Sequence, residues 1–250
     1  MNLDELASGL PKTELVYLSE MNCAKLDAKI VRAVSEKRTH AYLVLDRTIF
    51  HPKGGGQPSD RGTVGSPAFS LTVKKAMDHK GVVIHWGKII SGTISEGQVA
   101  CELDWPYRHL LMRRHTAAHL LDHCLASAIS KQVQTTDSWL DEPCYVGYSG
   151  KAPALEDLKK AEDLANTMIM KGAGVGIDYL TPEESGTLLR TAPNFERLPN
   201  LQEIRIVTIA GCTPIPCGGT HVSNTSELEK LKITQAEQLT SDTYRVYFSV

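Results

Sequence analysis

The pattern of apolar residues changes character once along this chain, close to Asp104. Before Asp104, short segments rich in β-branched and aromatic residues are separated by clusters of Gly, Pro, Asp and Ser. This spacing is typical of an all-β barrel or sandwich. We therefore predict a β-barrel-like domain over residues 1–105 and an α+β domain over residues 106–250, which places the chain in the α+β fold class. Strands in the first part are expected at 13–20, 28–34, 40–50 and 81–90.

A long helix is predicted to open the second part. Pro106 stands where the first turn of a helix tolerates proline, and apolar residues then recur at helical spacing over about six turns. A second helix is expected over 152–170. Thr181 and Glu184 are spaced as a capping box, with proline between them, and predict the start of a short third helix. Strands are expected near 174–180, 202–210, 229–235 and 243–249.

The charge and cysteine content exclude several classes of protein. Twenty-seven Lys and Arg residues face 29 Asp and Glu residues, so binding to nucleic acid would need a local basic patch. No apolar run approaches the ~20 residues that span a bilayer, and the N-terminus lacks the layout of a signal peptide. The six cysteines are too few and too scattered for a disulfide scaffold. We expect a reduced, cytoplasmic protein that does not enter membranes.

Two short motifs carry the residue types of a zinc site. His115 and His119 are four residues apart on the predicted helix, so both rings face the same side. Cys217 and His221 flank a Gly-Gly-Thr turn that follows a predicted strand and a proline-restricted segment. Thiolate and imidazole are ligands that zinc prefers, and we predict one zinc ion per chain held by these four side chains.

The motifs leave the role of the zinc open. Metalloproteases carry Glu directly after the first His, whereas this chain has Thr116 there, so that route to peptide hydrolysis is disfavoured. Four protein ligands are typical of structural zinc, because catalytic zinc keeps an open position. Either Cys217 ligates weakly or leaves, or the zinc expands its shell, or the site is structural.

A glycine-rich segment lies in the first part of the chain. Gly54, Gly55 and Gly56 precede Gln57, without the Lys-Ser/Thr ending of a P-loop and without a helix after them, so nucleotide hydrolysis is disfavoured. A hairpin between strands and a functional loop both remain open for this segment.

These motifs together resemble the editing domain of alanyl-tRNA synthetase and its free-standing AlaX relatives, of the medium-length type. The resemblance rests on His115-Thr-Ala-Ala-His119, on Cys217-Gly-Gly-Thr-His221-Val, on the glycine-rich segment from Phe50 to Gly62 and on the closing Tyr244–Phe248 strand. It covers nearly the whole chain in the same order, with no room for a class II aminoacylation domain. Threonyl-tRNA synthetases carry a related editing domain with similar His and Cys spacing.

The resemblance implies zinc-dependent hydrolysis, in trans, of the ester that joins serine, or glycine, to alanine tRNA. A site that hydrogen-bonds the serine hydroxyl discriminates against alanine, since its polar groups would otherwise stay unpaired. Zinc would supply hydroxide or polarise or orient the ester, or the tRNA ribose hydroxyl would relay a proton. The loop of Gly54, Gly55, Gly56 and Gln57 is expected to close over the pocket. Candidate partners of the serine hydroxyl are Thr116, Gln134, Thr136 and Ser138.

Contacts to tRNA are expected from cations near these motifs. Arg108, Arg113 and Arg114 flank or lie on the predicted zinc helix. Lys53 and Arg61 flank the glycine-rich segment. Phosphate contacts of this kind would make activity sensitive to salt. Two other hypotheses stay open, namely a structural-zinc module that binds tRNA without hydrolysis and a general zinc amidase or esterase.

Overall fold

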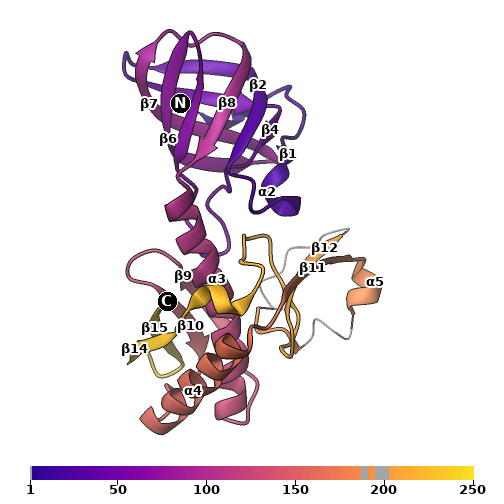
Figure 1. The fold of residues 1–250 in the computed structure, drawn as a ribbon, viewed down its shortest axis with the longest axis vertical. Coiled ribbons are helices and arrows are strands. Elements are labelled where there is room, and N and C mark those ends of the chain that lie inside the picture. Colours follow the sequence, from indigo (N-terminus) through magenta and orange to yellow (C-terminus); the bar gives the residue numbers. More distant parts are fainter. Residues whose placement is uncertain (1, 187–190, 195–202) are drawn as a thin grey trace. The chain divides into compact units, whose positions relative to one another are not determined.

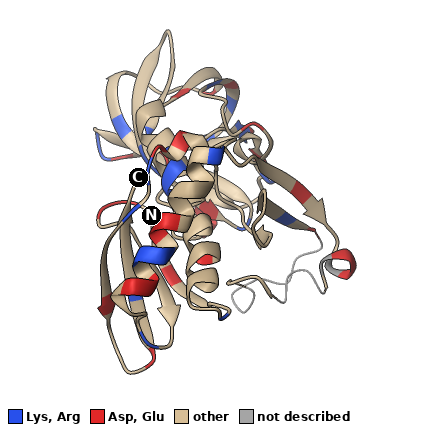
Figure 2. Ribbon diagram, turned by 60° about the horizontal axis from the view of Figure 1, so that its bottom comes forward, with Lys and Arg blue, Asp and Glu red and all other residues tan. Residues whose placement is uncertain are grey.

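The structure, a computed structural model, describes residues 2–186, 191–194 and 203–250 (Figure 1). The chain divides into two compact units. We call residues 1–54 and 58–110 the barrel unit, and residues 55–57 and 111–250 the α+β unit. Residues of both charge signs are distributed along the ribbon of both units (Figure 2). Among the described residues, no helix is both long and apolar enough to cross a membrane.

The barrel unit is built on a closed barrel in which every neighbouring pair of strands is antiparallel. Its interior is filled by alternate apolar residues of the strands, such as Leu43, Leu71 and Val73. Register shifts at three places, two of them in the pairing of β6 with β7, mark bulges that bend the strands and help the sheet to close. The predicted barrel is confirmed. In spatial order its strands are β2 (Lys25–Glu36), β3 (His40–Leu45), β7 (Val82–Gly92), β6 (Phe69–His79), β5 (Gly62–Ser66) and β8 (Gly97–Leu103).

The expected strand at 13–20 is mostly wrong. Only β1 (Glu14–Leu15) is extended, pairing in parallel with β4 (Arg47–Thr48), and the chain then turns into α2 (Val16–Ser19), which buries Val16 and Tyr17. The expected strand at 40–50 is interrupted because the Asp46 carboxylate accepts hydrogen bonds from the backbone N–H groups of Lys29 and Arg47. A short helix, α1 (Leu3–Ala7), begins after Asn2, whose side chain caps it.

Helix α3 (Trp105–Ala128) confirms the predicted long helix. Its residues up to Leu110 belong to the barrel unit, and those from Leu111 on belong to the α+β unit. Within the α+β unit the helix is buried on most sides, since Met112, Ala117, Leu121 and Leu125 are all fully or almost fully buried. A helix buried in this way holds its side chains in fixed positions.

A four-stranded antiparallel sheet and a second helix accompany α3 in the α+β unit. The sheet has the order β14 (Lys232–Gln238), β15 (Thr243–Ser249), β10 (Tyr145–Ser149) and β9 (Thr135–Trp139). Helix α4 (Leu155–Lys171) buries Leu158, Ala161, Ala165 and Ile169 and ends at Gly172, whose left-handed conformation favours glycine. This confirms the helix predicted over 152–170.

A small sheet completes the α+β unit, with the order β11 (Val175–Leu180), β12 (Ile204–Ile209) and β13 (Ile215–Pro216). The capping box at Thr181 is present and starts α5 (Pro182–Ser185), as predicted. A 3₁₀ helix, η3 (Thr225–Leu228), precedes β14. The strand expected at 202–210 corresponds to β12, and residue 202 of that prediction lies outside the described residues.

Candidate metal centre

Four side chains from α3 and from the loop after β13 meet inside the α+β unit. Helix α3 presents His115 and His119 on one side, one turn apart, with ring centroids 5.1 Å from each other. The loop brings Cys217 and His221 to the same place, and the Cys217 Sγ lies 3.3 Å from the Nε2 atoms of both His115 and His221. One ligand atom from each of the four residues lies within 4.8 Å of the other three. The two sequence motifs therefore converge.

The donor chemistry of this cluster fits a metal ion. The three histidines are buried, and the buried Nδ1 of His119 has no hydrogen-bond partner among the described residues. Burial, and to a smaller extent the charge of Arg205, lowers the pKa of His119 to about 3, so its ring is neutral. Burial raises the pKa of Cys217, while the Gly219 N–H and Arg205 lower it. Three imidazoles beside a sulfur ligand form a set that could hold zinc.

Gln57 supports the cluster from the glycine-rich segment. Its Oε1 lies 2.8 Å from the Nδ1 of His115 and also accepts a hydrogen bond from the backbone N–H of Thr220 at 3.1 Å. Its Nε2 donates to the Thr220 hydroxyl at 2.9 Å, and the whole side chain is buried. When Nδ1 of His115 donates to Gln57, the lone pair of Nε2 points toward Cys217, as metal-bound histidines require. The sequence interpretation placed Gln57 in the loop but did not find this contact.

Thr116 has a role different from the one expected. It is fully buried, and its hydroxyl oxygen lies 3.1 Å from the Nδ1 of His221 and accepts a hydrogen bond from the backbone N–H of Val222 at 3.2 Å. Both contacts orient His221 toward the cluster. We therefore no longer count Thr116 among the groups that touch the substrate, because its oxygen is directed to a candidate metal ligand.

Arg205 on β12 holds the loop that carries Cys217. Its guanidinium donates to the carbonyl oxygens of Cys217 and Gly219 at 2.6 and 3.0 Å, and its own carbonyl accepts from the Cys217 N–H. Gly219 must lack a side chain, since a Cβ there would lie 2.1 Å from Cε1 of His115. Sequence reasoning missed Arg205, although a lone arginine inside the apolar strand Ile204–Ile209 was a visible signal.

The tip of the glycine-rich segment lies against strand β9. The carbonyl of Gly56 accepts a hydrogen bond from the Leu140 N–H at 3.0 Å, and the Ser138 hydroxyl donates to the Gly55 carbonyl at 3.5 Å. Gly56 has a φ of 82°, and a Cβ on it would lie 2.1 Å from the Ser138 Oγ. Glycine is thus required at 56 by conformation and by space. Gly54 is exposed and belongs to the barrel unit.

The remaining pocket candidates lie on or beside β9. Gln134 and Thr136 are exposed, and Ser138 is half-buried. The Thr136 hydroxyl donates to the Asp137 carboxylate at 3.2 Å, and the Gln134 carbonyl accepts from the Ser149 N–H at 2.9 Å. The structure therefore brings Ser138 together with Gly55 and Gly56, while no contact among the described residues ties Gln134 to the metal cluster.

Two of the expected tRNA contacts are buried. Arg108 is fully buried, its Nε donates to the Asp60 carboxylate at 2.8 Å, and its Nη2 donates to Asp60 and to the Ile49 carbonyl. Arg114 is 7% exposed and pairs with the Glu142 carboxylate. Since both guanidinium groups are taken up inside the protein, we no longer count Arg108 and Arg114 among the candidate tRNA contacts.

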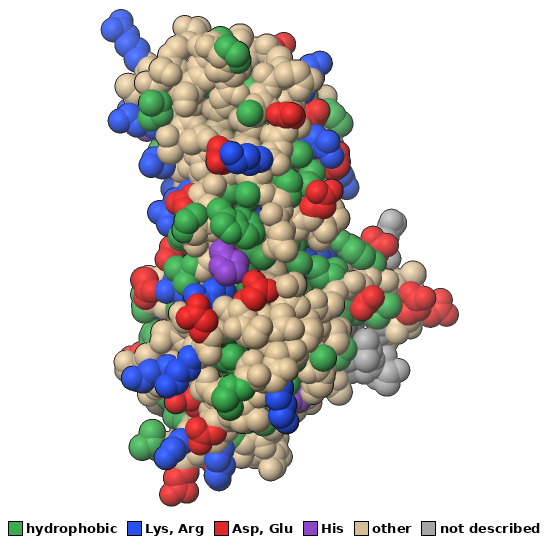
Figure 3. Space-filling view, in the orientation of Figure 1, with side chains coloured by type: hydrophobic (Ala, Val, Ile, Leu, Met, Phe, Trp, Pro, Cys, Tyr) green, Lys and Arg blue, Asp and Glu red, His purple; other side chains and the backbone are tan. Residues whose placement is uncertain are grey.

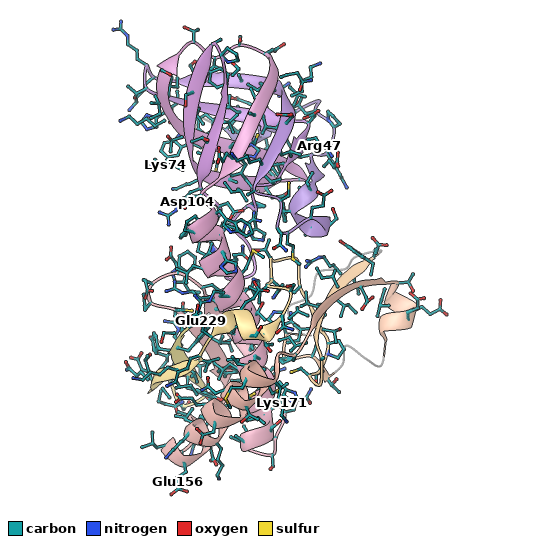
Figure 4. The ribbon with its side chains drawn as sticks, viewed as in Figure 1. Arg47, Lys74, Asp104, Glu156, Lys171 and Glu229 are labelled. Atoms are coloured by element: carbon teal, nitrogen blue, oxygen red, sulfur yellow. The ribbon has the colours of Figure 1, made fainter. Side chains whose placement is uncertain are left out.

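The other three cations differ in their exposure. Arg113 is half-buried, donates to the Leu228 carbonyl at 2.9 Å and lies 3.6 Å from a Glu229 carboxylate oxygen. Lys53 and Arg61 are exposed. Glu229 is labelled in Figure 4.

Comparisons with known proteins agree with these features. Residues 6–107 match the family model described as tRNA synthetases class II (A), and residues 204–247 match the one described as threonyl and alanyl tRNA synthetase second additional domain. The alanyl-tRNA editing protein AlaX-L of Pyrococcus horikoshii is 32% identical over 94% of this chain, and AlaX-M of Methanosarcina barkeri is 29% identical over 95%. The alanine–tRNA ligase of Crocosphaera subtropica is 28% identical over 98%.

The matches differ in how much of each relative they cover. The chain spans 57% of the AlaX-L relative and 29% of the Crocosphaera ligase, but 99% of the AlaX-M relative. All three alignments cover more than nine-tenths of this chain. They therefore span both units, the glycine-rich segment, the His115 motif and the Cys217 motif. The chain is therefore similar, over most of its length, to alanyl-tRNA editing proteins and to a region of alanine–tRNA ligases.

Proposed function

We propose that this protein hydrolyses the ester bond of alanine tRNA that carries the wrong amino acid, serine first and glycine second, with one zinc ion bound at the cluster. The observation that carries the proposal is the convergence of His115, His119, Cys217 and His221, with one ligand atom of each within 4.8 Å of the others. Relatives that carry the name alanyl-tRNA editing protein, similar over more than nine-tenths of this chain, supply the substrate class.

The reaction adds water to the ester carbonyl, breaks the bond to the ribose oxygen and leaves the free amino acid and an uncharged tRNA. A zinc ion in such a site supplies Lewis-acid chemistry. The residues of the chain hold that site in place. Gln57 keeps a proton on Nδ1 of His115, Thr116 orients His221, and Arg205 fixes the backbone of the loop from Cys217 to Gly219.

Selection of serine is assigned to strand β9 and the loop tip. Ser138 and Thr136 present hydroxyl groups there, and the backbone of Gly55 and Gly56 lies against Ser138. One of these polar groups would pair with the hydroxyl of a bound serine. With alanine bound, the same group would have no partner, and a difference of this kind discriminates strongly between the two amino acids. Gln134 stays a candidate on the exposed side of the same segment.

A deacylation panel tests the proposal. Alanine tRNA charged with serine, glycine or alanine is incubated with the protein, with and without a chelator, and the release of amino acid is followed. We expect fast release of serine, slower release of glycine and almost none of alanine, and loss of all release after zinc is removed. Activity that persists without metal would rule out the zinc mechanism. Threonine tRNA charged with serine covers the related threonyl system.

The second candidate function is a structural zinc module that binds tRNA without hydrolysis. It is favoured by the ligand set itself, because four protein ligands close the coordination shell of a zinc ion. The same panel separates the two functions. A protein that holds one zinc ion and binds tRNA, but releases no amino acid from any of the charged tRNAs, would be the structural module.

A further inference from the structure

The outer surface of the barrel unit changes character between two neighbouring regions. In one region Val34, Tyr42 and Met77 pack with Leu6 of α1, so the helix covers an apolar part of the barrel. The adjacent region carries cations and aromatic rings, and we call it the basic face. Lys and Arg side chains project along the left edge of the barrel unit in Figure 3. The basic face consists of Lys37, Arg38, His40, Lys75, Trp86 and Lys88.

The strand register places these residues side by side. Lys88 on β7 lies opposite His40 on β3, and Trp86 lies opposite Lys75 on β6. Lys37 and Arg38 are in the turn that joins β2 to β3. The intervening positions, such as Ala41, Val73 and Gly87, are buried, so alternate residues of the strands face outward.

The cations of the basic face are not neutralised. All four of Lys37, Arg38, Lys75 and Lys88 are exposed, and none of them forms an ion pair with any described residue. The acid beside them is Glu36, whose oxygens accept hydrogen bonds from Tyr42 at 3.0 Å and from the Trp86 indole at 2.8 Å. The face is therefore strongly positive, although the whole chain has a net charge of −2.

The rings of the basic face are already arranged for stacking. The imidazole of His40 lies parallel to the Trp86 indole, with centroids 5.0 Å apart and an interplanar angle of 11°. The Lys75 Nζ is 6.0 Å from the centre of the Trp86 ring. The hydrogen bond from the Trp86 indole N–H to the Glu36 carboxylate holds this ring in place. Fixed aromatic rings among exposed cations are the arrangement by which proteins hold RNA, since bases stack on the rings and phosphates pair with the cations.

A hollow of mixed charge lies next to this surface on the barrel. Thr72 lies opposite Lys88 on one side and Thr63 of β5 on the other. Both threonines line the hollow, which has a volume of about 430 Å³ and is also lined by two cations, Arg61 and Lys74, and by two acids, Glu102 and Asp104. Figure 4 shows Lys74 and Asp104 at the same end of the barrel. Arg61 is held over the ring of Tyr107, 3.4 Å from its centroid.

We propose that the basic face binds RNA, with Lys37, Arg38, Lys75 and Lys88 pairing with backbone phosphates and Trp86 and His40 stacking on an unpaired base. The choice of RNA over an acidic protein rests on the stacked rings and on the proposed function, whose substrate is a tRNA. The four cations lie outside the two sequence motifs of the metal cluster, and the motifs did not point to them.

Binding of an uncharged alanine tRNA transcript tests this inference without any hydrolysis. The variant K37Q/R38Q/K75Q/K88Q should bind the transcript about tenfold or more weakly near 0.1 M salt, and the slope of log K against log salt should shrink by about 3, at roughly 0.7–0.9 per lost phosphate contact. The matched control K159Q/K171Q/K230Q/K232Q removes the same charge from exposed positions of the α+β unit. It should change the affinity by less than about twofold to threefold, as expected for remote charges screened at this salt.

A second variant tests stacking. W86L should weaken binding about fivefold or more, whereas W86F, which keeps a ring, should weaken it less. Circular dichroism and thermal melting confirm that each variant is folded. An equal loss of tRNA affinity in the two quadruple variants would show that only the net charge matters, and it would overturn the proposal. The proposal would also be overturned if K37Q/R38Q/K75Q/K88Q kept its affinity for tRNA but lost binding to polyglutamate, because the basic face would then be a site for acidic proteins. Weakened binding without any deacylation by the parent protein would leave this inference standing and remove only the proposed function.

Discussion

Each of the two units buries histidine in its interior, and the units differ in how the ring nitrogens are used. In the barrel unit, His85 lies 2.8 Å from the Thr48 hydroxyl through Nε2 and 3.2 Å from the Leu43 carbonyl through Nδ1. In the α+β unit, Nδ1 of His119 is buried without a hydrogen-bond partner among the described residues. Burial lowers the pKa of both rings, to about 4 for His85 and about 3 for His119.

Both rings are therefore neutral at pH 7, and the pKa does not separate structure from function. The separation comes from the hydrogen bonds. The buried His85 imidazole has a partner on each nitrogen, whereas the buried His119 imidazole keeps an unpartnered nitrogen and belongs to the cluster with Cys217 and His221, as expected for a metal ligand. The comparison predicts that zinc binds to the α+β unit and that acid destabilises both units, through His119 in the α+β unit and through His85 in the barrel unit.

Removal of two candidate ligands should have the largest effect. The variant H115A/H119A should lose zinc and lower the rate of deacylation on the order of 100-fold or more, because it removes two of the four side chains that converge. Zinc content by atomic absorption and deacylation of serine-charged tRNA measure the two losses. The variant H123A is the control on the same helix, since His123 is outside the cluster, and it should keep both properties. Loss of zinc in H123A would show that the metal is bound one helical turn further along α3, with His123 as a ligand.

Acid should destabilise the barrel unit through His85. Its pKa in the folded state, about 4, lies below the ordinary value of 6.5 that applies after unfolding. The unfolded chain therefore binds the proton first, so the stabilisation is complete above pH 6.5 and is lost as the pH falls from 6.5 to about 4. The loss amounts to about 3 kcal/mol in the free energy of unfolding.

Urea unfolding at several pH values measures this loss. The variant H85Q keeps groups that hydrogen-bond to Thr48 and Leu43 but does not titrate, so its stability should depend less on pH in this interval. An equally steep dependence in H85Q would assign the acid sensitivity to other residues. Zinc content should be unchanged in H85Q at pH 7, because His85 is not part of the cluster.

Loss of the Gln57 contact should have a smaller effect. The variant Q57M keeps a similar volume but gives His115 no acceptor, and it should weaken zinc binding about 10- to 100-fold. The variant Q57E keeps an acceptor for Nδ1 of His115 and should restore most of the affinity. Competition with a chromophoric chelator measures both values. Equal affinities for Q57M and the parent would show that Gln57 does not position His115.

The fold could be predicted where the sequence pattern is local. Helices α3 and α4 have apolar residues at helical spacing over many turns, and the capping box at Thr181 lies within four residues. Strand β5 was missed because Gly62–Ser66 offers only Val64 to the core, so it shows no run of apolar residues. The pairing that makes it a strand comes from β6, which follows it directly in a hairpin, and from β8, which is distant in sequence.

The candidate site, like the fold, could be predicted only where its residues are close together in the sequence. The four convergent side chains were found from two motifs with short spacing, and their binding of zinc stays a proposal. Gln57 was assigned to a loop only, because its contacts with Thr220 join residues 163 positions apart. Arg108 was misjudged because its position beside the motif says nothing about burial, and its partner Asp60 lies 48 positions away.

The three residues Gly55–Gln57 belong to the α+β unit although they stand in the first quarter of the chain. A fragment that begins at residue 106 would therefore have both metal motifs but lack the acceptor for His115 and the backbone that lies against Ser138. Any gene rearrangement that transfers the second half by itself would transfer an incomplete module. We therefore expect a fragment of residues 106–250 to bind zinc more weakly than the whole chain.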